Sequence, residues 1–158
     1  PPTHMADSTE HLHLGTGIGP LRFGMTMEQV RKAIGEPEEV EKSDESDEFD
    51  HQAWNYLDLG YSLYFDEEDA NRLSCIETDR PDLRLYGEAV IGKSPAEVKA
   101  LMARHGHPEA EEETLDANEL QVSYDQEMID FYFVDDELAV INFGVFIDEE
   151  THDVKWPA

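Results

Sequence analysis

Histidines beside carboxylates are the side chains of this chain whose types and spacing suit a metal ion. His11 and His13 form one His-x-His pair, His105 and His107 form a second, and many acidic residues lie nearby in the sequence. Zinc sites use such ligands, but they need three or four that converge on one point. Neither pair has a third ligand at a spacing that forces convergence. We therefore expect no designed metal site and no bound cofactor.

Acid–base catalysis and nucleophilic attack are the other chemistries that these residue types allow. Asp135 and Asp136 are adjacent carboxylates, but neighbours on a strand or turn tend to point apart, which argues against an acid–base pair. Cys75 alternates with Leu73 toward the expected core, which predicts a small buried side chain rather than a nucleophile. The sequence also contains no nucleophile elbow, Walker loop or zinc signature. We therefore expect a protein that is not an enzyme.

Carboxylates dominate the charge of the chain. Its 158 residues include 38 Asp and Glu against 11 Lys and Arg, a formal net charge of −27. Such a charge repels phosphates and anionic lipid headgroups. In addition, no apolar run approaches the roughly 20 residues that span a bilayer. The composition therefore argues against direct binding to nucleic acids or membranes.

The acids are concentrated in two segments. Residues 36–50 hold nine carboxylates and one lysine, and residues 109–119 hold six carboxylates. One hypothesis is that both segments are loops that dock onto a cationic groove of a partner protein, because opposed potentials speed encounter and select partners. The alternative is that they are solvated loops of an acid-rich domain adapted to high salt.

Two aromatic residues beside the first acidic segment add to the docking hypothesis. Trp54 and Tyr56 either anchor a partner, as such residues do in interface hot spots, or pack in the core at strand spacing. The candidate partner-binding residues are therefore Glu38, Glu39, Glu41, Asp44, Glu45, Asp47, Glu48, Asp50, Trp54, Tyr56, Glu111, Glu112 and Glu113.

Capping boxes mark the starts of two helices that would position these segments. Thr26 is followed three positions later by Gln29, and Ser94 is followed by Glu97. In each pair the hydroxyl and the longer side chain satisfy free amides of the first turn. Pro95 follows Ser94 at a position where its missing N–H costs nothing. Apolar residues then recur at helical spacing, which predicts two helices of about two to three turns.

The two helices belong to an internal repeat. Gly24–Val30 aligns with Gly92–Val98 at an offset of 68 residues. Period-two apolar patterns predict strands over Ala53–Leu57, Tyr61–Phe65, Leu73–Thr78, Leu120–Tyr124, Met128–Val134 and Leu138–Ile147. The predicted fold is α+β: a tandem repeat of one short helix followed by three antiparallel strands, with the helices packed on a shared or paired antiparallel sheet. Residues 1–5 are expected to be an expression-tag remnant, and 6–80 and 81–158 the two repeats of one compact unit.

The start of the first helix resembles a known signature. It consists of Phe23–Thr26, Gln29–Val30, Gly35 and Pro37, and it resembles the helix start of the β-lactamase inhibitory proteins and of small envelope lipoproteins of the barrel-assembly machinery. Many bacterial immunity proteins that neutralise toxins look similar. The tandem arrangement of two helix-plus-sheet halves is similar to the inhibitory proteins in particular. The resemblance implies a non-enzymatic protein that inhibits another protein.

The resemblance and the charge together predict an immunity protein. Its partner would be a basic protein toxin or toxin domain, such as a nucleic-acid-targeting one, held by the acidic loops. Because Cys75 is the single cysteine and no N-terminal signal is apparent, we expect a cytoplasmic protein that is monomeric when free. The alternative is an acid-rich domain of unknown role that is adapted to high salt.

Overall fold

A computed structural model describes residues 10–43 and 51–157 of the chain. The described residues are mainly β, with 46% in strands and 15% in helices. In chain order the elements are β1 (His11–His13), β2 (Gly17–Ile18), β3 (Leu21–Arg22), α1 (Met27–Ile34), β4 (Glu39–Lys42), β5 (His51–Tyr56), β6 (Tyr61–Asp66), the 3₁₀ helix η2 (Glu67–Asp69), β7 (Arg72–Thr78), β8 (Arg84–Leu85), β9 (Glu88–Ala89), α2 (Pro95–Arg104), β10 (Glu111–Asp116), β11 (Glu119–Tyr124), β12 (Ile129–Val134), β13 (Glu137–Gly144), β14 (Phe146–Ile147) and β15 (Val154–Lys155).

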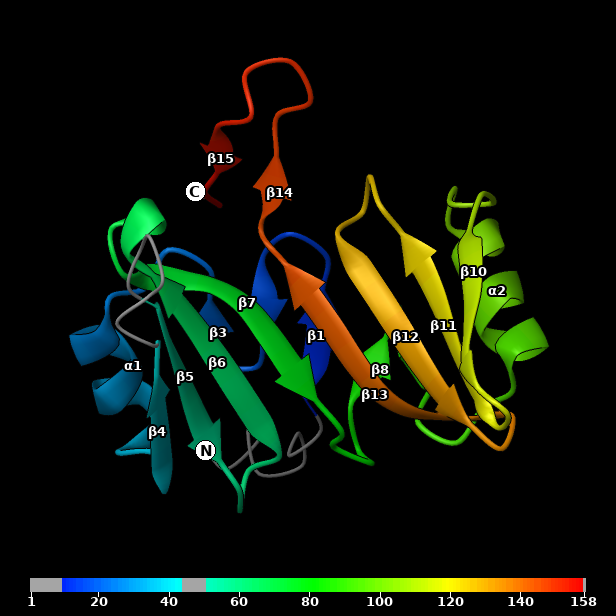
Figure 1. Cartoon of the computed structure of the whole chain (residues 1–158), viewed down its shortest axis with the longest axis horizontal. Helices are drawn as coiled ribbons and strands as arrows, with labels where there is room; N and C mark the ends of the chain where they lie inside the picture. The colour runs from blue at the N-terminus through cyan, green and yellow to red at the C-terminus, as the bar shows by residue number, and fades with distance from the viewer. Residues whose placement is uncertain (1–9, 44–50, 158) are drawn as a thin grey trace, which may run out of the picture.

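One eight-stranded antiparallel sheet forms the centre of the molecule (Figure 1). Its strand order is β10-β11-β12-β13-β7-β6-β5-β4, so each half of the chain contributes four consecutive strands. The halves join where β13 pairs with β7, with Ile141 opposite Thr78 and Phe143 opposite Ile76. The sheet is therefore continuous from the first half to the second.

The prediction of one helix followed by three strands is wrong. Each helix is followed by four strands, and the additional strands, β4 and β10, are the two edges of the sheet. Both coincide with the acidic segments, which a sequence pattern assigns to loops because like charges repel. At a sheet edge the side chains stay in water, and charged residues there also prevent edge-to-edge aggregation. An acidic strand is therefore stable at the edge, where it would not be at the centre.

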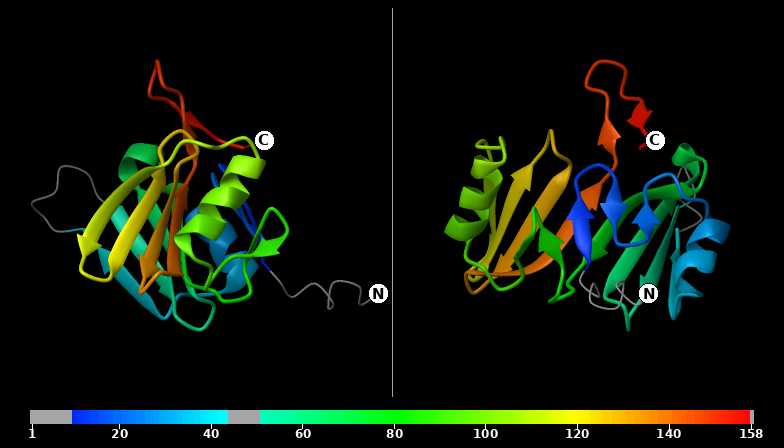
Figure 2. Two further views of the ribbon diagram at one scale, coloured as in Figure 1. Left: turned by 90° about the vertical axis from the view of Figure 1, so that its right-hand side faces the viewer. Right: turned by 180° about the vertical axis from the view of Figure 1, so that it is seen from behind.

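The helices and a second, smaller sheet cover one face of the large sheet (Figure 2). The smaller sheet has the order β3-β2-β1-β8-β9, and β1 pairs in parallel with β8. Both predicted capping boxes are confirmed, because Thr26 accepts from the amide of Gln29 and Ser94 from that of Glu97, with the reciprocal bonds also present. Hydroxyl caps thus begin both helices on the same side of the sheet.

The core lies between the large sheet and these covering elements. Leu63 and Phe65 of β6, and Phe131 and Phe133 of β12, are buried at every second strand position. Val98, Leu101 and Met102 of α2 are also buried. Alternation places these side chains on one side of the sheet and leaves their neighbours on the other.

Two extra residues interrupt the alternation in the middle of the sheet. Ser74 is inserted in β7 opposite the step from Tyr64 to Phe65, and Ala139 is inserted in β13 opposite the step from Tyr132 to Phe133. A bulge of this kind moves the next side chain to the opposite face. The same bulge therefore occurs in both halves.

A short hairpin formed by β14 and β15 extends past one end of the large sheet (Figure 1). The ring of Phe146 fills the space that a Cβ at Gly15 would occupy, and Trp156 lies against Gly24, whose Cβ would be 3.3 Å from the indole. The absence of a side chain at these two glycines lets the smaller elements hold the hairpin. No helix among the described residues has the length and apolar character needed to cross a membrane.

Candidate protein-binding face

The side of the large sheet that faces away from the helices is the candidate binding surface. In the part of the chain that the structure describes, no helix lies against this side (Figure 2). We call it the open face. The strand registers and burial place on it Glu39 and Glu41 of β4, His51, Ala53 and Asn55 of β5, Ser62, Tyr64 and Asp66 of β6, Arg72, Cys75 and Glu77 of β7, Glu137, Val140 and Asn142 of β13, Asp130, Tyr132 and Val134 of β12, Glu119, Gln121 and Ser123 of β11, and Glu111, Glu113 and Asp116 of β10.

The charge of the open face is mainly negative. Its carboxylates are Glu39, Glu41, Asp66, Glu77, Glu111, Glu113, Asp116, Glu119, Asp130 and Glu137. Among its described positions one is a cation: Arg72 of β7 is the strand partner of Asp66, and its guanidinium donates to the Gly24 carbonyl at 3.2 Å. Lys42 of β4 lies opposite Gln52 on the helix side. The carboxylates outnumber Arg72, so the face carries a negative field.

Two tyrosines from equivalent positions of the two halves occupy the middle of the open face. Tyr64 and Tyr132 are partly buried among neighbouring strands. Burial raises the pKa of Tyr64 to about 12, with the charge of Glu77 as the next cause. Burial also raises the pKa of Tyr132, followed by the charges of Asp130 and Glu77. Both phenols thus stay protonated at neutral pH, and each presents an aromatic ring and an O–H donor.

Hydrogen bonds hold the polar side chains of the open face in fixed positions. Ser62 donates to the Asn55 side chain at 2.8 Å, and Asn55 donates in turn to the Glu41 carboxylate at 2.8 Å. In the second half, Gln121 donates to the Ser123 hydroxyl at 3.1 Å. Such contacts lower the entropy lost when a partner binds, because the side chains are already ordered.

Cys75 lies on the open face and not in the core as the sequence predicted. The bulge at Ser74 moves it to the side opposite Leu73, which period-two alternation cannot anticipate. Its thiol donates to the Asn142 side-chain oxygen at 3.2 Å, and burial, followed by the charge of Glu77, raises its pKa to about 12. Since the thiolate is the nucleophile, a raised pKa argues against a nucleophilic role for this thiol at neutral pH.

Metal ligation is not favoured by the geometry. Within residues 10–43 and 51–157, no three His, Cys, Asp or Glu side chains are grouped so as to hold a metal ion. His105 stacks on Tyr86 with ring centroids 3.9 Å apart. His107 lies 3.0 Å from the Tyr86 hydroxyl and 3.5 Å from the Glu127 carboxylate. These rings join the β8–β9 turn to the end of α2.

The candidate acids are placed in three different ways. Glu39, Glu41, Glu111 and Glu113 lie on the open face, at its two opposite edges. Glu112 pairs with Lys99 of α2 at 2.7 Å, and Glu38 accepts from the amide of Leu57 at 2.9 Å. Asp44, Glu45, Asp47, Glu48 and Asp50 lie outside the described residues. The edge acids therefore flank the face, with six strands between them.

The candidate aromatic anchors face the helices. Trp54 and Tyr56 are each 1% exposed. Arg31 of α1 lies over the Trp54 ring, 4.7 Å from its centroid, and the Tyr56 hydroxyl donates to the Gly35 carbonyl at 2.7 Å. Side chains buried in this way offer no surface to a partner, and we leave them out of the binding face.

Sequence reasoning missed the middle of the face. Tyr64, Tyr132, Glu77 and Asn142 were not among the candidates, although each alternates with a buried apolar residue. That alternation was the available signal, because the polar partner of each core residue on a one-sided sheet faces solvent.

Comparison with known proteins identifies no family for this chain. No family model and no curated protein matches the chain. Among solved structures, an extracellular protein containing a SCP domain from Bacillus anthracis str. Ames is similar with a TM-score of 0.46 and 12% identity. The alignment covers 77% of this chain and 43% of that protein. The chain thus spans less than half of that protein, and a likeness at this level carries no argument about function.

Proposed function

We propose that this protein is an inhibitor of the immunity type, which binds a cationic protein in a stoichiometric complex through the open face. The observation that supports the proposal is the composition of that face. It combines two central tyrosines with carboxylates from all but one of the eight strands, and its described positions include a single cation, Arg72. The proposed setting is the cytoplasm, and the proposed target is a basic toxin, such as one that acts on nucleic acid.

The size of the open face suits a protein partner. Eight strands at a spacing of about 4.8 Å and some six residues long present roughly 700 Å². A standard interface buries about 800 Å² on each partner. The face is thus large enough for one protein to cover, and much wider than a site for a small molecule.

The polarity of the face suits a basic partner. Carboxylates at both edges and in the middle attract a positive groove from a distance, and the tyrosines then supply the buried contacts that slow dissociation. A groove that binds nucleic acid is positive and has apolar or aromatic surfaces for bases. An acidic surface with two rings would compete for such a groove.

A second candidate is an acid-rich domain adapted to high salt. Acidic side chains outside the open face favour it: Glu67 and Glu68 of η2, and Glu149 and Glu150 of the hairpin, are exposed as well. Salt adaptation predicts a protein that melts at low temperature until molar salt screens its repulsion. A partner-binding protein folds at ordinary ionic strength, and a melting series in NaCl separates the two.

The experiment that tests the proposal pairs capture with a face-specific variant. The full chain and a Tyr64→Ala/Tyr132→Ala variant are used to capture proteins from a lysate of the source cell, with Val40→Ala/Leu57→Ala as a control. Val40 and Leu57 are 45% and 62% exposed but are not on the open face.

We expect a basic protein that binds one to one, whose activity the full chain inhibits, and whose Kd rises at least about 30-fold in the tyrosine variant but not in the control. The association rate should fall as NaCl is raised. Recovery of no protein, or equal binding by the tyrosine variant, would contradict the proposal.

A further inference from the structure

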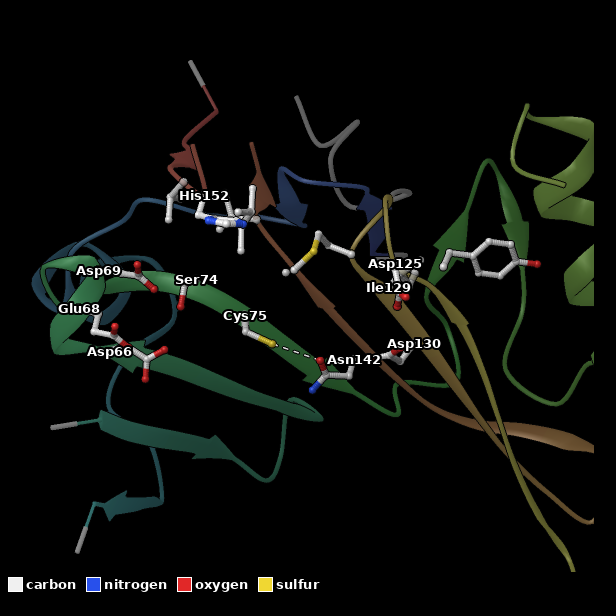
Figure 3. A pocket seen from close by; sticks show the side chains of 16 residues that line it. Asp66, Glu68, Asp69, Ser74, Cys75, Asp125, Ile129, Asp130, Asn142 and His152 are labelled. Carbon is white, nitrogen blue, oxygen red and sulfur yellow. Dashed lines mark hydrogen bonds between the residues drawn. The ribbon is translucent and has the colours of Figure 1, made fainter. Parts of the chain in front are cut away.

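A cavity of about 410 Å³ lies at one end of the open face (Figure 3). It is bounded by the η2 end of the sheet, by the start of β12 and by the β14–β15 hairpin. It shares Asp66, Cys75, Asp130 and Asn142 with the open face, so the two surfaces are continuous. Its volume is within the range of about 300–1,000 Å³ that ligand pockets occupy.

One part of the cavity lining is apolar. Met128 follows the β11 strand, and Ile147 and Val154 come from the hairpin that overhangs the sheet. Ile147 is 40% exposed although it is a large aliphatic side chain. Gly144 lies among them, where a Cβ would be only 3.2 Å from the Ser74 carbonyl oxygen. The hairpin thus offers a hydrophobic surface of which Ile147 remains exposed among the described residues.

The rest of the lining is mostly polar and includes five carboxylates and one histidine, His152 of the hairpin. Asp66, Glu68 and Asp69 lie on one side of the cavity and Asp125 and Asp130 on the other, as Figure 3 shows. Within the part of the chain that is described, the recorded ion pairs involve none of these five. Burial and then the charges of Asp66 and Glu68 raise the pKa of Asp69. The rim therefore has an excess of negative charge.

The spacing of these carboxylates decides which kind of cation the cavity can bind. A metal ion needs its ligands within a few ångströms of one point, and the described residues hold no such group of three. Carboxylates spread around an apolar hollow instead suit a cation with a long stem and a broad head. Arginine has an aliphatic stem that packs on apolar surface and a planar head with five donors, which can span separated acceptors.

We propose that this cavity is the receptor for an arginine side chain of the protein partner, with its stem against Met128, Ile147 and Val154 and its guanidinium between Asp66 and Asp69, which lie on the same side of the cavity (Figure 3). The assignment rests on the proposed function, which it deepens by naming the anchor that the partner supplies. The hairpin then acts as an arm that holds the partner at one end of the sheet.

The test is a titration of the free full chain with N-acetyl-arginine-methylamide, followed by amide chemical shifts. Two further probes separate the parts of the ligand: N-acetyl-norleucine-methylamide has the stem without the head, and MgCl₂ is a cation without the stem. We expect saturable shifts around Met128, Asp69 and Ile147 with the arginine probe, and none that saturate with the other two.

Variants with the same change of charge provide the control. Asp66→Asn/Asp69→Asn removes the two rim carboxylates that would hold the guanidinium, and Glu41→Gln/Glu113→Gln removes two from the open face outside the cavity. We expect the first to weaken binding of the arginine probe at least tenfold and the second to leave it within a factor of two. Melting curves confirm that both variants fold, and Ile147→Ser tests the stem contact independently.

The outcomes distinguish this inference from the proposed function. Shifts that do not saturate, equal loss in both double variants, or the same shifts with MgCl₂ would overturn the arginine receptor. Because the titration needs no partner, such a result leaves partner binding by Tyr64 and Tyr132 standing. Conversely, saturable arginine binding with no partner recovered would overturn the inhibitor proposal alone.

Discussion

The two faces of the large sheet are built from the same strands but lie in different surroundings. On β12, Phe131 is buried among the covering elements, while Tyr132 next to it faces the open side. Leu63 and Tyr64 of β6 repeat the contrast in the other half. One step along a strand therefore separates a residue of the core from one on the open face. The difference teaches that side chains of the open face can change without much cost in stability.

The largest effect that would test this contrast comes from neighbouring alanine substitutions. Phe131 is fully buried, so Phe131→Ala should lower the free energy of unfolding by about 3–5 kcal/mol, through lost transfer energy and a cavity. Tyr132→Ala should lower it by no more than about 1 kcal/mol, since its ring is only partly buried. Urea unfolding with a common m-value measures both.

Equal losses of unfolding free energy in the two variants would contradict the contrast between the two faces. They would mean that Tyr132 is as important to the fold as the core, and that the open face is a structural surface. A small loss for Phe131→Ala would equally contradict the assignment of the core to the helix side.

A smaller effect is expected from the caps of the helices that cover the sheet. Ser94→Ala removes the acceptor for the Glu97 amide, and it should lower the free energy of unfolding by about 1 kcal/mol. Ser94→Thr keeps the hydroxyl and should lose much less. If the open face is independent of the covering layer, amide shifts on β6 and β12 will not change in Ser94→Ala. Widespread shifts there would show that the two faces are coupled.

The smallest effect on stability is expected from Asp69, a carboxylate at the end of the open face. Because the folded pKa of Asp69 is raised, mainly by burial, its charge opposes folding at any pH above its unfolded value of about 3.9. Asp69→Asn should therefore raise the urea midpoint at pH 7. The gain should disappear as the pH falls below that unfolded value, where the carboxyl is protonated in both states. A midpoint that falls at pH 7 would contradict the direction.

How far the sequence predicts this structure depends on the kind of signal. The helix starts at Thr26 and Ser94 were predictable, because a capping box is local and its hydrogen bonds need no distant partner. The inner strands were also predictable, since large apolar residues at every second position need a buried face. The edge strands β4 and β10 were not, because their side chains are all exposed and carry no apolar alternation.

Which residues lie on the open face was harder to predict, because it depends on contacts between segments that are far apart in the chain. The bulge at Ser74 decides which side Cys75 occupies, and nothing local to β7 announces it. Trp54 looked like an anchor by type, but α1 covers it and Arg31 lies over its ring. Both outcomes follow from tertiary packing, which the sequence of a single segment does not contain.

The seam between β7 and β13 has a symmetry that bears on the origin of the molecule. Thr78 lies opposite Ile141, and Ile76 lies opposite Phe143. Leu73–Ile76 of β7 aligns with Leu138–Ile141 of β13 at an offset of 65 residues, and in this alignment the two pairs exchange, so a dyad passes between Glu77 and Asn142. A half-length ancestor could therefore have closed this seam with a second copy of itself, as homodimers do. Identical residues would then have met on the axis, where two glutamates, for example, would repel each other. Fusion into one gene frees the two positions to differ, and here Asn142 donates to Glu77 at 3.4 Å.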